Sequence, residues 1–164
     1  MGDRCHCSLV LYTPLHGVAA AELAEALSDC HRAYTILDID QELTRDGYLS
    51  FDEVNYAQMD EPVREVLKRH AISYGWWNEA GCEYGEGVEL FNAETGECEE
   101  FAVLDQDFIL TLREVDTDHV DKLRRWDAWL KQMNTARLER HQRALEALAA
   151  PNAPIGPQAT SATA

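Results

Sequence analysis

The sequence predicts an α+β fold in which a ferredoxin-like (βαββαβ) core carries an added β-hairpin and a long C-terminal helix. Three observations support this prediction. Apolar stretches of strand character alternate with helical repeats through the first half of the chain, two further apolar runs flank a glycine turn, and a helical repeat then continues to about residue 150. The order strand, helix, strand, strand, helix, strand is that of the split βαβ arrangement.

The expected core elements occupy the first half of the chain. Four strands, rich in β-branched and aromatic residues, are expected over residues 5–13, 34–40, 48–54 and 72–78. Apolar residues spaced by three and four predict a helix over 17–33, and Asp60 followed by Pro62 marks the start of a second helix. A two-layer fold leaves one sheet face open, yet the adjacent residues Trp76 and Trp77 point to opposite faces. We therefore expect both faces to be covered.

The second half of the chain supplies the additions. Strands over 88–92 and 99–104 flank a turn that contains Gly96, and a further strand is expected over 108–115. The long helix, over about 119–150, has a second half that could pair with another copy, so a monomer or a dimer through this helix is expected. The chain thus divides into an acidic α+β domain, a C-terminal helix packed on it or projecting from it, and a disordered tail, over residues 1–116, 117–150 and 151–164.

The charge of the chain is strongly negative and unevenly divided. Its 164 residues include 14 Lys and Arg against 30 Asp and Glu, a net charge of −16. Residues 1–118 hold 7 basic and 26 acidic residues, whereas residues 119–150 hold 7 basic and 4 acidic ones. Such a surface repels nucleic acids and anionic membranes and attracts basic proteins. The alternative is that the charge only keeps the protein soluble.

The compartment is inferred from the amino terminus and from the cysteines. The first residues have a single arginine and a short apolar run, without the layout of a secretory signal. The cysteines are odd in number and scattered, which suits a reducing cytoplasm better than a disulfide framework; they are Cys5, Cys7, Cys30, Cys82 and Cys98. We expect a cytoplasmic protein.

The main candidate site is an acidic segment around the predicted hairpin. Between Arg69 and Arg113 there are ten acidic residues and no Lys or Arg. The expected partner-binding residues are Trp77, Glu79, Glu83, Tyr84, Glu86, Glu89, Glu94, Glu97, Glu99 and Glu100. Carboxylates held on strands can imitate nucleic-acid phosphates, and aromatic residues beside them provide anchors. The sequence therefore predicts a small non-enzymatic interaction protein that binds a basic, nucleic-acid-binding protein and inhibits it by mimicry. Accessory proteins of phages and mobile elements often have this size and charge.

An alternative function is the binding of a divalent cation. Residues 42–53 resemble the calcium loop of an EF-hand, with Gly47 at the sharp sixth position. The candidate ligands are Glu42, Thr44, Asp46, Tyr48, Ser50 and Glu53. The first position usually holds the shorter Asp, and the residues before the loop favour a strand over the required helix. The competing interpretation is a β-hairpin that turns at Asp46-Gly47. No other cofactor is expected.

No motif in the sequence indicates a particular enzymatic reaction. The six histidines are dispersed, and no phosphate loop, nucleophile elbow or paired-histidine zinc motif is present. Cys5, His6 and Cys7 could meet Cys30 and His31 in a zinc site, but buried cysteines are the more common outcome. An enzyme with a pocket on the sheet face stays open as a third possibility.

Overall fold

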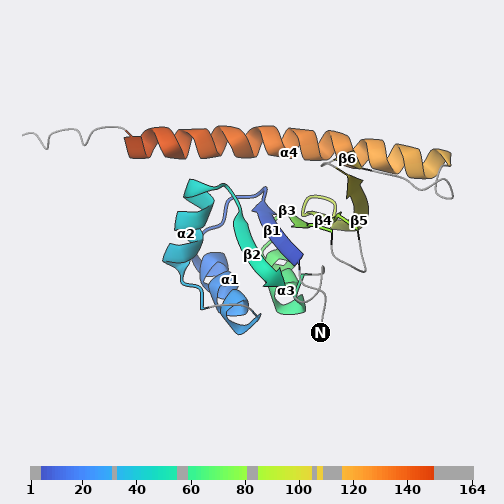
Figure 1. Ribbon diagram of the computed structural model, residues 1–164. Coiled ribbons are helices and arrows are strands. Elements are labelled where there is room, and N and C mark those ends of the chain that lie inside the picture. The colour runs from blue at the N-terminus through green and yellow to red at the C-terminus, as the bar shows by residue number, and fades with distance from the viewer. Residues whose placement is uncertain are drawn as a thin grey trace, which may run out of the picture.

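Figure 1 shows the computed structural model, in which a β-sheet lies between a group of three helices and one long helix. The structure describes residues 5–30, 33–54, 59–80, 85–104, 107–108 and 116–149. The helices are α1 (Gly17–Cys30), α2 (Ile36–Arg45), α3 (Glu61–Arg69) and α4 (Thr117–Ala149). The strands are β1 (Cys5–Leu11), β2 (Leu49–Val54), β3 (Tyr74–Asn78), β4 (Gly87–Asn92), β5 (Glu97–Leu104) and β6 (Asp107–Phe108). An α+β fold with a long C-terminal helix is therefore confirmed.

The sheet does not have the predicted ferredoxin-like arrangement. Five strands lie in the order β2-β1-β3-β4-β5, and the two-residue strand β6 adds to β5. Each described pair of neighbouring strands is antiparallel, and the order and number of the strands differ from those of the predicted βαββαβ sheet. Strands β3, β4 and β5 follow one another along the chain as neighbours, so this half of the sheet is a meander.

The prediction of a strand over 34–40 was wrong, because residues 36–45 form α2. Thr35 caps this helix: its Oγ1 accepts a hydrogen bond from the Asp38 backbone N–H (3.2 Å), and its own backbone N–H donates to Asp38 Oδ2 (2.8 Å). This reciprocal capping box satisfies two donors at the helix start and outweighs the β-branched composition of the segment. Asp46-Gly47 consequently joins a helix to a strand, and Gly47 takes a φ of 78°, which favours glycine.

The strands place one apolar core on each face of the sheet. On the face toward α1, α2 and α3, Leu9 and Trp76 belong to a core that also contains Cys5 and Cys7, which are buried as expected. On the opposite face, Val88 and Leu90 belong to a second core together with residues of α4. The expectation that both faces are covered is confirmed, because adjacent strand residues alternate between the two cores.

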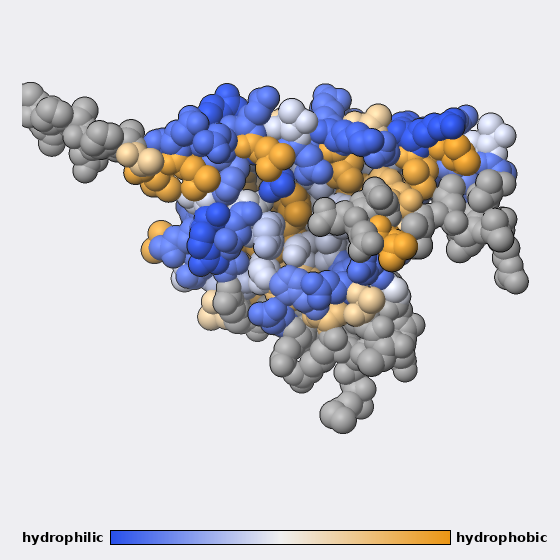
Figure 2. Space-filling model, turned by 45° about the horizontal axis from the view of Figure 1, so that its top comes forward, coloured by the Kyte–Doolittle hydropathy of each residue, from blue (hydrophilic) through white to orange (hydrophobic). Residues whose placement is uncertain are grey.

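Helix α4 crosses the second face with its aromatic side chains turned inward. Trp126 is 2% exposed and meets Phe101 edge-on at 6.1 Å between ring centroids, while Trp129 meets Tyr12 at 5.4 Å. Figure 2 shows apolar side chains gathered along the edge of α4 that turns toward the body. Asp116 caps the helix by accepting a hydrogen bond from the His119 backbone N–H at 2.8 Å.

Ionic contacts join α4 to the sheet at its N-terminal half. Lys122 Nζ lies 2.5 Å from Glu99 Oε2, and Arg125 Nη2 lies 3.5 Å from Glu97 Oε1. These contacts pair acidic residues of the domain with basic residues of the helix, and the two groups occupy separate regions of the sequence. Because all four side chains are substantially exposed, apolar burial contributes more to the docking than the ion pairs do.

Candidate functional site

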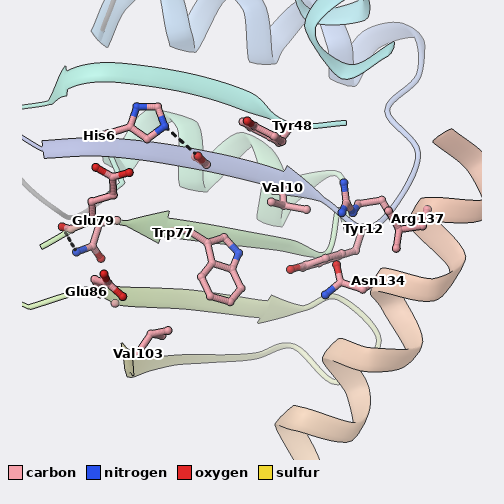
Figure 3. A pocket seen from close by; sticks show the side chains of 14 residues that line it. His6, Val10, Tyr12, Tyr48, Trp77, Glu79, Glu86, Val103, Asn134 and Arg137 are labelled. Carbon is pink, nitrogen blue, oxygen red and sulfur yellow. Dashed lines mark hydrogen bonds between the residues drawn. The ribbon is translucent and has the colours of Figure 1, made fainter. Parts of the chain in front are cut away.

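The face of the sheet that α4 crosses contains a cavity of about 840 Å³. Helix α4 forms one wall, and strands β1, β3, β4 and β5 contribute the floor and the other end (Figure 3). Alternation in β1 explains which side chains reach the cavity: Cys5, Cys7 and Leu9 point to the helices, and His6 and Ser8 point to the cavity. The volume falls within the range of small-ligand and side-chain pockets.

Trp77 lies in the middle of the cavity floor (Figure 3). Its indole ring packs against the core that contains Tyr12, whose side chain is 1% exposed. Burial raises the pKa of Tyr12 to about 12, although the Trp77 indole N–H and the charge of Arg137 act in the opposite direction. A Cβ at Gly75 would lie 2.8 Å from both Trp77 Nε1 and Tyr12 Oη. The small size of Gly75 therefore permits this aromatic pair.

One end of the cavity is acidic. Glu79 and Glu86 lie there beside His6 (Figure 3). Among the described residues, neither carboxylate has an ion pair or a side-chain hydrogen bond. Carboxylates beside an aromatic face form a favourable environment for an ammonium or guanidinium group.

The His6 imidazole belongs to a polar network at this acidic end. Its Nδ1 lies 2.8 Å from Asp52 Oδ1, and its Nε2 lies 3.4 Å from Ser8 Oγ and 3.5 Å from Ser50 Oγ. The order carboxylate, imidazole, hydroxyl is that of a hydrolytic triad, but the Asp52 side chain is 87% exposed, whereas the triad carboxylate is buried. The network holds the imidazole in place beside the acidic end of the cavity.

The other end of the cavity supplies hydrogen-bond donors from α4. Asn134 and Arg137 lie there (Figure 3). Arg137 Nη1 donates to the Gly47 carbonyl at 3.1 Å, but its buried Nε has no hydrogen-bond partner within the described part of the chain. One turn further along α4, Arg140 Nη2 donates to the Tyr12 carbonyl at 2.5 Å. Burial, together with the charges of Arg137 and Arg143, lowers the pKa of Arg140.

The structure separates the predicted partner-binding residues into distinct groups. Trp77, Glu79 and Glu86 line the cavity. Glu94 and Glu100 are exposed and, within the described ranges, have no ion pair. The remaining residues of the prediction are Glu97 and Glu99, which contact α4, Glu89, which is buried, and Glu83 and Tyr84, which lie outside the described residues.

Glu89 was wrongly assigned to the surface. It is 6% exposed and lies on the helix-facing side of β4, where Arg64 of α3 reaches it. Arg64 Nη2 and Nε donate to its carboxylate at 2.6 and 3.1 Å, and the Tyr74 hydroxyl donates at 2.6 Å. Burial acts to raise the pKa of Glu89, but these hydrogen bonds and the Arg64 charge lower it below its ordinary value of 4.5.

The predicted calcium loop over 42–53 is not a continuous loop in the structure. Glu42 and Thr44 lie within α2, and Ser50 and Glu53 lie within β2. Asp46 Oδ2 accepts hydrogen bonds from Arg45 Nε and Nη2 at 2.9 and 2.6 Å. Tyr48 is exposed and lies at the cavity. Within the described residues, no three His, Cys, Asp or Glu side chains are grouped as they would be around a metal ion.

The predicted partner-binding residues do not include four polar residues of the cavity, His6, Ser8, Asn134 and Arg137. Alternation from the buried Cys5 and Cys7 would have placed His6 and Ser8 on the opposite face of β1, so a signal for these two was present. No local signal identifies Asn134 and Arg137, because the apolar positions of α4 do not keep a constant helical spacing and so do not define one inward face. Their approach to β1 depends on how the helix docks.

Comparison of the chain with models of protein families, with curated proteins and with solved structures found no match. Among the helices of the described residues, none combines the length and the apolar character that crossing a bilayer requires. We therefore infer function from the chemistry of the described side chains.

Proposed function

We propose that this protein is a non-enzymatic interaction protein that binds a basic protein partner through the half of its sheet formed by β3, β4 and β5. The supporting observation is a set of carboxylates in this half that have no cation among the described residues. These carboxylates belong to Glu79, Glu86, Glu94 and Glu100. A fixed set of like charges lowers the stability of the compact state unless something else neutralises it.

The cations of the described chain are mostly committed to internal pairs. Arg64 binds Glu89 and Glu61, and Arg69 binds Glu22. Further pairs are Arg45 with Asp46, Lys122 with Glu99, Arg124 with Asp121, Arg125 with Glu97, and Lys131 with Asp127. The excess of carboxylates over cations therefore remains for an external partner, which a negative field attracts over several ångströms at physiological salt.

The finer form of the proposal is that the partner is a nucleic-acid-binding protein and that this chain occupies its basic groove. A row of carboxylates on a strand and a turn can take the place of backbone phosphates. A partner bound in this way would lose its nucleic acid, so inhibition follows from competition for one surface.

The test is capture of a partner from a nuclease-treated lysate, with Glu94→Lys and Glu100→Lys introduced together. We expect one basic protein to be retained, to be displaced by added DNA or RNA, and to be lost from the double variant. The matched control reverses two exposed charges on helices α1 and α2, Glu25→Lys and Asp40→Lys, and should retain the partner. Retention that resists nucleic acid would disprove mimicry, and equal retention by both variants would disprove the proposed surface.

A further inference from the structure

We infer that the cavity beneath α4 is a recognition pocket for an arginine or lysine side chain of a partner polypeptide. The side chain would lie on the Trp77 indole with its charged group between Glu79 and Glu86. This inference rests on the proposed function, because it names the part of the basic partner that the chain recognises.

The acidic end of the cavity fits a cation better than it fits any other group. Glu79 and Glu86 extend from the ends of β3 and β4, which are neighbours in register through Asn78 and Gly87. Figure 3 shows both carboxylates on the same side of Trp77. No described residue forms an ion pair with either carboxylate. The acidic end of the cavity therefore keeps its negative charge.

The floor of the cavity is suited to the flat guanidinium or to the alkyl stem of lysine. Trp77 is only partly buried, although it sits between two covered strands. Its position is fixed by packing against the core that contains Tyr12 and by the close approach over Gly75. A tryptophan face held rigidly next to carboxylates attracts a cation electrostatically without losing further conformational freedom.

The α4 end of the cavity matches the main chain that carries such a side chain. The buried Nε of Arg137 has no acceptor among the described residues, and Asn134 lines the same end of the cavity. A buried donor of this kind usually has a partner. Peptide carbonyl oxygens would supply acceptors here while the cationic side chain reaches the acidic end, so one polypeptide segment satisfies both ends.

The two ends together exclude other occupants. A nucleic acid would place phosphates against Glu79 and Glu86, which repel them. A purely apolar ligand would leave two carboxylates and a buried Arg137 N–H without partners in a desolvated site. A peptide with a basic side chain avoids both costs.

The experiment is a titration of the full chain with short peptides, in which the indole N–H resonance of Trp77 is monitored by nuclear magnetic resonance spectroscopy. One peptide contains a single arginine among alanines and glycines. The control peptide contains citrulline in place of the arginine, which has the same shape without the charge. We expect saturable shifts of the Trp77 resonance with the arginine peptide and binding at least about fivefold weaker with the citrulline peptide.

Two matched variants locate the binding. Glu79→Gln with Glu86→Gln should weaken the arginine peptide roughly tenfold or more, because two charge-assisted contacts are lost. Glu94→Gln with Glu100→Gln makes the same change in net charge outside the cavity and should alter the affinity less than about twofold. Unchanged Trp77 resonances with the arginine peptide, or equal binding of the citrulline peptide, would overturn the pocket.

Two experimental outcomes distinguish a failure of the pocket hypothesis from a failure of the proposed function. If Glu79→Gln with Glu86→Gln captures the partner normally while Glu94→Lys with Glu100→Lys loses it, the interaction surface stands and the pocket is refuted. If the cavity variant binds no arginine peptide and the wild type binds one without retaining any basic protein, the pocket stands and the proposed protein partner is refuted.

Discussion

Replacement of Glu89 by glutamine should lower the free energy of unfolding by about 2 to 3 kcal/mol at neutral pH. The glutamine keeps the shape of the side chain and removes its charge. Arg64 then loses the carboxylate that accepts hydrogen bonds from its Nη2 at 2.6 Å and its Nε at 3.1 Å. The Tyr74 hydroxyl, donating at 2.6 Å, keeps only a neutral acceptor.

The magnitude follows from how far the pair is removed from water. The Glu89 side chain is 6% exposed and the Arg64 side chain 18% exposed, and breaking a buried ion pair from one side costs about 3 to 5 kcal/mol. Arg64 also binds Glu61 at 2.6 Å, an exposed residue that remains in the variant. This second contact reduces the expected loss below that range, to about 2 to 3 kcal/mol.

The effect should depend on pH in a defined direction. Contacts with Arg64 and Tyr74 lower the pKa of Glu89 below 4.5 in the folded chain. Its contribution is therefore complete above the unfolded pKa and is lost as the pH falls through the folded value. The difference between the wild type and Glu89→Gln should shrink below about pH 4.5.

Urea denaturation followed by tryptophan fluorescence measures this difference through linear extrapolation of the unfolding free energy. Glu61→Gln is the matched control, since it removes the exposed partner of the same arginine and should cost less than about 1 kcal/mol. Equal stability of Glu89→Gln and the wild type at neutral pH, or a difference that does not change between pH 6 and pH 3, would refute the buried network.

Three further predictions address α4, the cavity floor and the calcium loop. Trp126→Ala should destabilise by about 3 to 5 kcal/mol in urea, whereas Trp126→Phe should cost far less, because the buried indole N–H has no partner among the described residues; similar losses would contradict this packing. Gly75→Ala should cost about 1 to 3 kcal/mol in thermal unfolding, because its Cβ would meet Trp77 and Tyr12 at 2.8 Å, and an unchanged midpoint would contradict that contact. Millimolar calcium should leave the melting temperature unchanged in wild type and Glu53→Gln alike; a shift present only in the wild type would restore the metal site.

Several local features were predictable from the sequence because neighbouring residues determine them. Asp60 and Pro62 start α3 as expected, and its buried face contains Val63 and Leu67. The hairpin turns at Gly96 with a φ of 73°, as the glycine between two apolar runs indicates. The capping box at Thr35 could also be recognised from the sequence, but the β-branched residues beside it suggested a strand.

The sequence by itself determined the fold class, the long basic helix, the alternation of side chains along each strand and the sign of the surface charge, since each depends on residues a few positions apart. The tertiary structure decided the rest. Strand order, the burial of Glu89 against Arg64 and the placement of Trp77 and Arg137 around one cavity depend on residues far apart in the chain. Local periodicity places a residue on a face, but only the packing of elements determines what that face contacts.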